Sequence, residues 1–260
     1  MRLRRLTTGG IGLLAAATLS LAGCAADNGS GTGTSTGGPA TATSAPAASA
    51  TAELTAAAQK LNDDTVTTEV TSNGLTSSGK IDPKGNKADV TMKVTASTGS
   101  ADFHVRALGD DVYIQADGLP NVQAGKWLHI DAAKAAGTSF DVIPDGDAAG
   151  ANRFLNTVAD VKKDGTGSYS GTLDLTKVPA GGGVSIDTLG DKAKAVPFTA
   201  TVDDQGRLTS LTIDMSALNA QLGSLKTTYS DFGSPVTVEA PATSDVVEPD
   251  PALLKALGIG

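Results

Sequence analysis

The sequence contains few of the residues that build most cores and most active sites. Its 260 residues include one cysteine, one tryptophan and two histidines, and aromatic residues make up only 3% of the chain. A single cysteine excludes an intrachain disulfide and a cysteine-based metal site. With 40% apolar residues overall, the chain is globular in class, and its core must consist mainly of small aliphatic side chains.

Positive charge is also scarce. The chain has 20 basic and 28 acidic residues, and its formal net charge is -8. Arg2, Arg4 and Arg5 lie at the very start, so a chain lacking residues 1–23 would carry 17 basic and 28 acidic residues, a net charge of -11. An acidic surface repels nucleic acid and anionic headgroups. We therefore expect no nucleic-acid partner, and any attachment to a membrane must come from a covalent or hydrophobic anchor.

The N-terminus predicts such an anchor. An apolar run of about eleven residues, Ile11 to Leu21, follows the arginines, whereas a membrane-spanning helix needs roughly twenty. The run is typical of the apolar region of a signal peptide. It ends in Leu21-Ala22-Gly23-Cys24, which resembles the lipobox of bacterial lipoproteins, where the cysteine thiol receives diacylglycerol.

We therefore predict a signal peptide over residues 1–23 and lipidation of Cys24 by S-diacylglycerol and an N-acyl chain. The mature protein would then be anchored on the extracytoplasmic face of the cell membrane. An ordinary secretory signal with a chance cysteine is the alternative. The Arg4-Arg5 pair leaves open whether export uses the general secretory or the twin-arginine pathway.

The segment after Cys24 is expected to be a flexible tether. Residues 25–50 are almost entirely Gly, Ser, Thr, Ala and Pro, which cannot bury enough apolar area to offset the entropy lost on ordering. A tether over 24–50 would let the domain stand about 25–30 Å from the membrane. Glycosylation of its Thr and Ser residues stays open. Residues 51–260 are predicted to form a single domain.

Hydrophobic periodicity predicts one short helix followed mainly by strands. Leu54, Ala57, Ala58 and Leu61 recur at helical spacing. From Thr65 the period changes to two, and tight turns join successive runs, which indicates an antiparallel meander. The predicted strands are Lys87–Thr95, Ala101–Ala107, Val112–Ala116, Lys126–Asp131, Ser168–Thr176, Val196–Val202, Leu208–Met215, Leu225–Tyr229 and Val236–Ala240.

Three further helices are predicted between or after these strands. They are Ala148–Val158, Ile186–Lys192 with Ser185 as its N-cap, and Pro251–Leu257 with Asp250 as its N-cap. Helices this short are marginal alone and must dock on the sheet. An antiparallel sheet whose apolar face is covered by short helices is an α+β architecture.

Five segments, together with the lipobox and the tether, carry a family resemblance. They are Gly125–Asp131, Tyr169–Leu173, Val196–Ala200, Asp204–Leu208 and Tyr229–Gly233. In this order they resemble the LppX/LprAFG lipoproteins of actinobacteria over roughly residues 51–245. The resemblance implies a half-barrel similar to the lipoprotein carrier LolA, in which a strongly curved antiparallel sheet carries short helices on its concave face. It also implies a hydrophobic cavity for acylated lipids or lipoglycans.

The sequence leaves the existence of that cavity open. Inward positions are mostly Ala, Val and Thr, which under-fill a concave sheet, but a thin core of small residues gives the same pattern. A cavity below about 300 Å³ would favour a closed core. The candidate cavity residues are Val90, Met92, Phe103, Val105, Ile114 and Phe198.

Catalytic and metal-binding patterns are absent from the sequence. His104 and His129 are predicted on the wet faces of strands, without metal-ligand spacing nearby and without a nucleophile elbow in the chain. Trp127, beside Leu128 and Ile130, is predicted to pack in the core or to line a groove. Three acidic pairs fall at predicted turns, where Asp bonds its own backbone: Asp63-Asp64, Asp110-Asp111 and Asp203-Asp204. We expect no enzymatic activity, no cofactor and no metal.

These observations lead to one hypothesis and one alternative. The hypothesis is a monomeric, membrane-anchored envelope lipoprotein that binds or carries acylated lipid or lipoglycan. An envelope transporter is a partner compatible with this hypothesis. The alternative is a non-enzymatic surface adaptor or sensory domain with a closed core that binds a protein partner.

Overall fold

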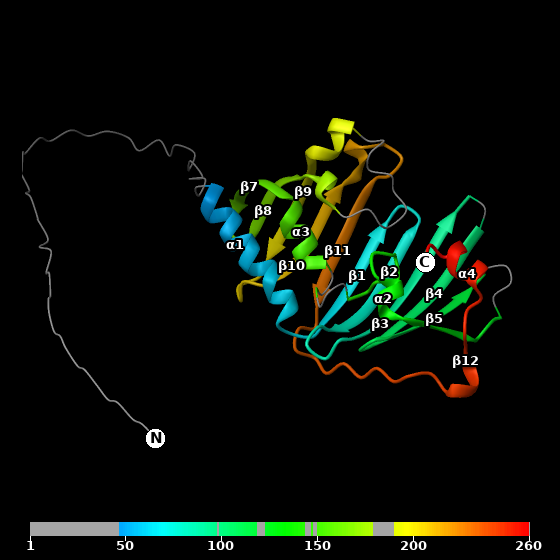
Figure 1. Ribbon diagram of the computed structural model, residues 1–260. Helices are drawn as coiled ribbons and strands as arrows, with labels where there is room; N and C mark the ends of the chain where they lie inside the picture. Colours follow the sequence, from blue (N-terminus) through cyan, green and yellow to red (C-terminus); the bar gives the residue numbers. More distant parts are fainter. Residues whose placement is uncertain are drawn as a thin grey trace, which may run out of the picture. The chain divides into compact units, whose positions relative to one another are not determined.

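The computed structural model describes residues 47–97, 99–118, 123–143, 147, 150–178 and 190–259, all within one compact unit, Ala42–Gly260. In this unit short helices cover one face of an open sheet of twelve strands (Figure 1). The strand order is β12-β6-β5-β4-β3-β2-β1-β11-β10-β9-β8-β7. The two end strands, β12 and β7, do not pair, so the sheet is not closed into a barrel. The predicted α+β class with an antiparallel sheet is confirmed.

The strands are β1 Val66–Ser72, β2 Leu75–Asp82, β3 Lys87–Ala96, β4 Gly99–Leu108, β5 Asp111–Asp117, β6 Trp127–Asp131, β7 Val158–Gly165, β8 Ser168–Leu173, β9 Val196–Val202, β10 Leu208–Asp214, β11 Ser224–Ser230 and β12 Val246–Val247. The helices are α1 Ala47–Gln59, α2 Ala132–Ala135, α3 Ala151–Thr157 and α4 Pro251–Ala256. All strand pairings are antiparallel except that of β12 with β6. The parallel pair arises because the chain returns along the sheet after β11 before it adds its last strand.

The strands from β3 to β6 and from β9 to β11 lie where alternation predicts them, with ends that differ by at most two residues. The run predicted over Ser168–Thr176 stops at Leu173, because the Asp174 side chain accepts a hydrogen bond from the Thr176 amide and opens a 3₁₀ turn, Leu175–Lys177. Val236–Ala240 is not a strand, so that prediction is wrong. Its extended backbone is held by a side chain instead, since the Arg106 guanidinium donates to the Glu239 carbonyl at 3.2 Å.

The helix predictions are confirmed in part. α4 begins at Pro251 behind Asp250, whose carboxylate accepts from the Ala252 and Leu253 amides at 2.6 and 3.2 Å. In the segment predicted over Ala148–Val158 the structure describes α3, and Val158 already belongs to β7. Residues 186–189 of another predicted helix lie outside the described residues, and Gly190–Lys194 is a 3₁₀ helix.

One face of the sheet builds the core. A cross-strand row on this face consists of Gly79, Val90, Val105, Ile114 and Leu128, one residue from each of β2 to β6. Its four side chains are all buried. Helices α1, α2 and α3 contribute buried residues to the same hydrophobic cluster, and leucines of α4 pack against it. The short helices therefore cover the apolar face, and the other face keeps the polar side chains.

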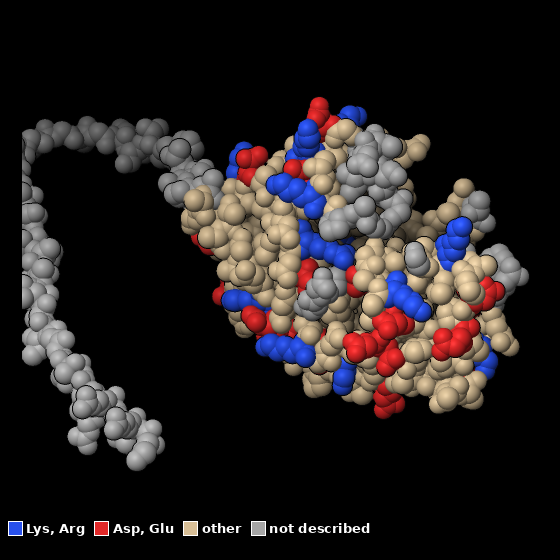
Figure 2. All heavy atoms as spheres, viewed as in Figure 1, with Lys and Arg blue, Asp and Glu red and all other residues tan. Residues whose placement is uncertain are grey.

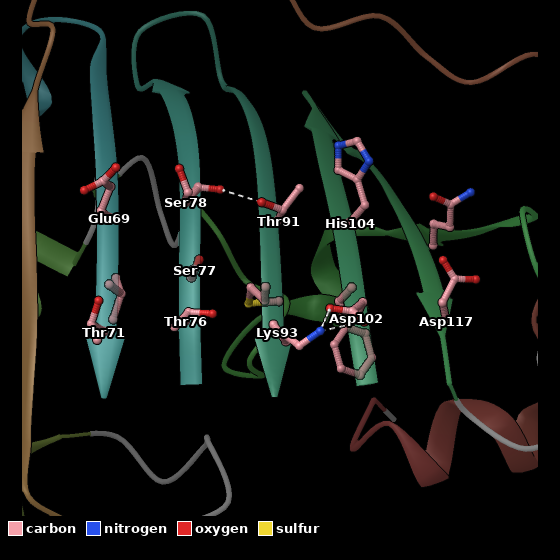
Figure 3. Close-up of a pocket in the computed structure, with 14 residues that line it drawn as sticks. Glu69, Thr71, Thr76, Ser77, Ser78, Thr91, Lys93, Asp102, His104 and Asp117 are labelled. Carbon is pink, nitrogen blue, oxygen red and sulfur yellow. Dashed lines mark hydrogen bonds and ion pairs between the residues drawn. The ribbon is translucent and has the colours of Figure 1, made fainter. Parts of the chain in front are cut away.

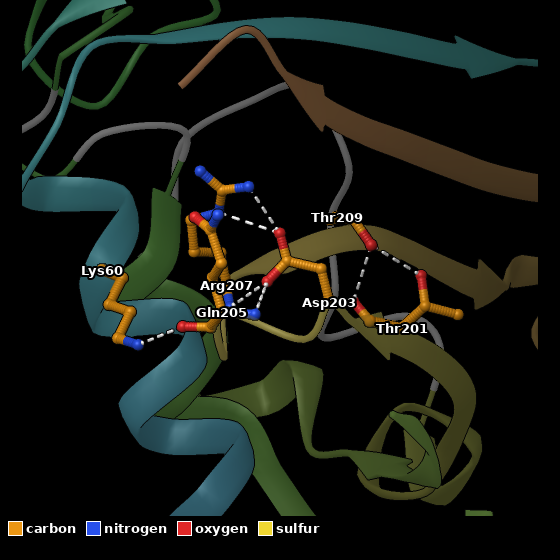
Figure 4. A network of polar contacts seen from close by, with 6 residues as sticks. All are labelled: Lys60, Thr201, Asp203, Gln205, Arg207 and Thr209. Carbon is orange, nitrogen blue, oxygen red and sulfur yellow. Dashed lines mark hydrogen bonds and ion pairs between the residues drawn. The ribbon is translucent and has the colours of Figure 1, made fainter. Parts of the chain in front are cut away.

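Helix α1 is fixed by polar contacts at its middle and just beyond its end. At the middle, Glu53 accepts hydrogen bonds from the Lys163 ammonium at 2.5 Å and the Tyr169 hydroxyl at 2.6 Å. These bonds, Lys163 first, lower the pKa of the Glu53 carboxyl to about 2, so the carboxylate stays ionised at neutral pH. Just after α1, Lys60 donates to the Gln205 carbonyl at 2.6 Å (Figure 4).

The turn that receives Lys60 is organised by Asp203. Its carboxylate accepts from the amides of Gln205 and Arg207, each at 2.9 Å, and from the Arg207 guanidinium at 2.8 Å (Figure 4). The prediction of Asp203 as a turn residue is confirmed. Because this turn joins β9 to β10, Lys60 fixes the end of α1, and the following Leu61, over those strands.

The tryptophan packs on the polar face and not in the main cluster. Trp127 is 8% exposed, its ring centroid lies 4.9 Å from that of His104, and the Arg106 guanidinium lies 4.7 Å over it. Asp89 bonds both neighbours, at 2.6 Å to His104 and 3.1 Å to Arg106. The predicted burial of Trp127 is confirmed, but its ring lies on the opposite face of the sheet from the main cluster. Adjacent residues of a strand point to opposite faces, and Leu128 already faces the cluster.

Candidate functional site

An apolar pocket lies between α3 and the apolar face of the sheet. This apolar pocket has a volume of ≈ 200 Å³. A separate hollow of ≈ 450 Å³ lies on the polar face of the sheet.

The floor of the apolar pocket is buried and its rim is partly exposed. The buried floor includes Leu61, Phe154 and Leu173. Partly exposed apolar side chains follow at the rim, among them Leu175 and Leu225. The full lining is Leu61, Gly150, Ala151, Arg153, Phe154, Thr157, Leu173, Leu175, Val178, Leu208, Leu211, Ile213, Leu225, Thr227 and Tyr229. Such a lining can hold an apolar group and offers few polar partners.

The position of α3 over the pocket is set by a buried carboxylate. Asp147 is 4% exposed and accepts from the Asn152 and Arg153 amides at 2.7 and 3.2 Å. It also accepts from the Asn62 side chain at 3.3 Å. These bonds satisfy amides in the first turn of α3, which have no partner within the helix. Asp147 therefore links the start of α3 to the segment that follows α1.

The two aromatic residues at the floor of the pocket are Phe154 and Tyr229. The Phe154 ring of α3 meets the Phe198 ring of β9 edge to face, with centroids 5.3 Å apart and an interplanar angle of 88°. Tyr229 contributes the phenol at the floor, and burial, together with the charge of Asp147, raises the pKa of its hydroxyl. The phenol is therefore neutral at physiological pH, and the floor carries no charge from it.

The only cation in the lining among the described residues is Arg153, whose side chain is exposed at the rim. Its guanidinium forms an ion pair with Asp141 at 3.2 Å. More widely, acidic and basic side chains are interspersed on the face in view in Figure 2. The apolar pocket therefore has a charged group at its rim and none at its floor.

The six cavity candidates lie elsewhere. Val90, Val105 and Ile114 are buried in the packed core, and Phe198 lies beneath Phe154. Met92 and Phe103 are partly buried and belong to the lining of the separate hollow of ≈ 450 Å³. The Phe103 ring packs against Phe140 with centroids 5.5 Å apart. None of the six is in the lining of the apolar pocket.

The sequence held a weak indication of the residues that do line the pocket. The helix predicted over Ala148–Val158 includes Phe154, and Leu61 belongs to the first apolar helical stripe. Periodicity gives the face on which each side chain lies, but not which strands a helix covers. That choice depends on the strand order, which brings β8 and β11 to either side of β9 and β10.

Both histidines lie on the polar face, as predicted, but each has a carboxylate partner. His104 bonds Asp89 at 2.6 Å, and His129 bonds Asp111 at 2.7 Å and Glu248 at 3.3 Å. The bond to Asp111 is the main cause of a raised pKa for the His129 imidazole. Among the described residues neither histidine bonds a serine or threonine hydroxyl, which a hydrolytic triad requires.

Within the described ranges no three His, Cys, Asp or Glu side chains are grouped so that they could hold a metal ion. In the same ranges no helix has the length and apolar character needed to cross a membrane. Cys24, the predicted signal peptide and nearly all of the predicted tether lie outside the described residues, although α1 begins at Ala47 and thus inside the range predicted as tether.

Comparison with known proteins adds no relative. No protein-family model matches this chain, and no curated protein matches it in sequence.

Proposed function

We propose that this protein is a membrane-anchored envelope lipoprotein that binds an acylated amphiphile and has no enzymatic activity. The observation that carries the proposal is the apolar pocket, with its buried floor and its partly exposed rim. The open antiparallel sheet with helices on one face supports a half-barrel of the LolA kind, with a curved sheet and α1 and α3 on its concave side.

The volume of the pocket limits what it can hold. An engineered apolar cavity of about 150 Å³ accepts benzene, so a pocket of ≈ 200 Å³ suits the end of one acyl chain and not a whole lipid. Each methylene group transferred from water into the pocket contributes about 0.8 kcal/mol to the free energy of binding. The proposed ligand therefore places a chain end against Phe154 and Leu173 and leaves its polar group near Arg153.

The second candidate function is a surface adaptor with a closed core that binds a protein partner. It is favoured by the same volume, which lies below the roughly 300 Å³ at which most small-ligand pockets begin. The close packing of Val90, Val105 and Ile114 favours it as well.

A substitution that fills the apolar pocket with a larger side chain distinguishes the two candidate functions. Leu225 lies at the rim and is partly exposed, so Leu225→Trp should block the pocket while the chain still folds. Leu222 is 38% exposed and lies outside the lining, which makes Leu222→Trp the matched control. A tryptophan at Val105 would not serve, because that side chain is fully buried and overpacking costs about 1–3 kcal/mol.

The measurement is native mass spectrometry of the Cys24→Ala chain purified from its own host. We expect a co-purified amphiphile on this chain and on Leu222→Trp, and its loss from Leu225→Trp. Absence of any amphiphile from the chain without a tryptophan substitution contradicts lipid binding and leaves the adaptor. The anchor is tested in the same strain, because Cys24→Ala should release a folded protein from the membrane fraction.

A further inference from the structure

A second hollow lies on the polar face of the sheet and has no part in the proposed function. It spans β1 to β5 and has a volume of ≈ 450 Å³, within the range of about 300–1,000 Å³ typical of small-ligand sites. Successive side chains of a strand point to opposite faces. Because Val90 and Val105 point into the core, their neighbours Thr91 and His104 point to the polar face and into this hollow.

The strand register aligns the polar side chains of the hollow in two rows (Figure 3). We call these ten residues the polar groove: Glu69, Ser78, Thr91, His104 and Gln115 in one row, and Thr71, Thr76, Lys93, Asp102 and Asp117 in the other. Five strands about 4.8 Å apart span about 19 Å, and rows two residues apart lie about 7 Å from each other. The groove therefore suits an elongated ligand that crosses the strands.

The lengths of these side chains explain the hollow. On β2 the groove residues are Thr76 and Ser78, which end at their γ atoms, and Thr91 on β3 is equally short. Glu69 on one side and His104 on the other are longer. Short hydroxyl-bearing side chains thus lie between Glu69 and His104, which come from the strands on either side (Figure 3).

The charges of the groove disfavour an anion. Its lysine, Lys93, pairs with Asp102 at 3.2 Å, and His104 bonds Asp89. The side-chain carboxylates of Glu69 and Asp117 form no hydrogen bond or ion pair with the residues that the structure describes. With acceptors in excess and no group of metal ligands among the described residues, the groove suits a neutral ligand that donates many hydrogen bonds.

We propose that the polar groove binds a neutral carbohydrate, as an extended oligosaccharide across β1 to β5. Sugar hydroxyls donate and accept hydrogen bonds, as do the Ser and Thr hydroxyls of the groove. The free carboxylates of Glu69 and Asp117 accept from sugar hydroxyls, and bonds to a charged acceptor are the stronger ones. This inference does not rest on lipid binding in the apolar pocket, which lies on the other face of the sheet.

Ligand binding in the groove can be followed by tryptophan fluorescence. Trp127 is the only tryptophan of the chain, and its ring contacts His104, a groove residue. We would titrate the full chain in detergent with maltohexaose, cellohexaose and mannohexaose, each to about 10 mM, ten times a Kd of 1 mM. Tryptophan fluorescence gives the affinity, and amide chemical shifts locate the site.

We expect at least one oligosaccharide to bind, with shifts confined to the two rows. Glu69→Gln and Thr76→Val should each weaken binding about tenfold, the effect of one lost hydrogen bond to a charged or well-aligned partner. Thr199→Val on β9, also exposed on a strand but outside the groove, should leave the affinity unchanged. The proposal is overturned if none of the three sugars binds, if the shifts lie elsewhere, or if Glu69→Gln and Thr76→Val bind as tightly as Thr199→Val.

Discussion

Gly171 on β8 should tolerate no side chain, and replacing it tests how tightly the floor of the apolar pocket is packed. A Cβ atom at this position would lie 2.7 Å from Cε1 of Phe198 and 2.9 Å from the Ala159 carbonyl oxygen. The Phe198 ring has little room to yield, because it is 2% exposed and meets Phe154 edge to face. Gly171→Ala therefore pushes the Phe198 ring toward α3 and the pocket.

Two opposing effects set the size of the change. Alanine in a strand is favoured over glycine by about 0.5–1 kcal/mol, whereas overpacking of a closed core costs about 1–3 kcal/mol. The clash should dominate, with a net loss of about 1–2 kcal/mol. For a domain of this size each kcal/mol lowers the Tm by about 2–4 °C, so we expect a fall of about 2–8 °C.

Thermal unfolding followed by circular dichroism measures this shift, and Gly165→Ala is the matched control. Gly165 lies on the neighbouring strand β7, and a Cβ atom there would meet nothing within 4 Å. Its replacement should leave the Tm unchanged or raise it slightly. A Gly171→Ala protein as stable as Gly165→Ala would refute the close packing of Phe198. If the clash is the cause, adding Phe198→Leu should recover part of the loss.

Two further predictions concern the C-terminal segment. Hydrogen bonding to Asp111 raises the pKa of His129 in the folded protein. The stabilisation from the charged imidazole is therefore full below about pH 6.5 and is lost as the pH rises through the folded pKa. Amide exchange at Val246 and Val247, corrected for intrinsic rates, should lose protection over this pH range, and His129→Gln should remove the pH dependence. Asp250→Ala should cost about 0.5–2 kcal/mol through loss of the α4 cap, seen as faster exchange in α4, whereas Asp250→Ser should keep most of the protection.

The alternation of the strands could be read from the sequence because it is a local property. A period of two in Lys87–Ala96 and in Val196–Val202 gives both the strand and the side chains that face the core. The cap of α4 could be read for the same reason, since Asp250 and Pro251 act within one turn. The two histidines were correctly placed on the polar face by their parity with buried neighbours.

Local sequence patterns give wrong predictions where a contact with a residue far away in the chain determines the structure. Val236–Ala240 alternates like a strand, but its backbone bonds the Arg106 side chain and has no neighbouring strand. Trp127 is buried by His104 and Arg106, which come from another strand. The carboxylate partners of the histidines likewise come from other segments: Asp89 and Asp111 from neighbouring strands, and Glu248 from just after β12. Spacing along the chain could not reveal them.

The sequence by itself determined the class of fold, most of the strands and the face of most strand side chains, because these follow from the local period and from turn and cap residues. Only the tertiary structure decided where the hollows lie. The strand order brings α3 over β8, β10 and β11 to form the apolar pocket, and the register aligns two rows of polar side chains over β1 to β5. Both arrangements depend on contacts between residues far apart in the chain, which no local pattern encodes.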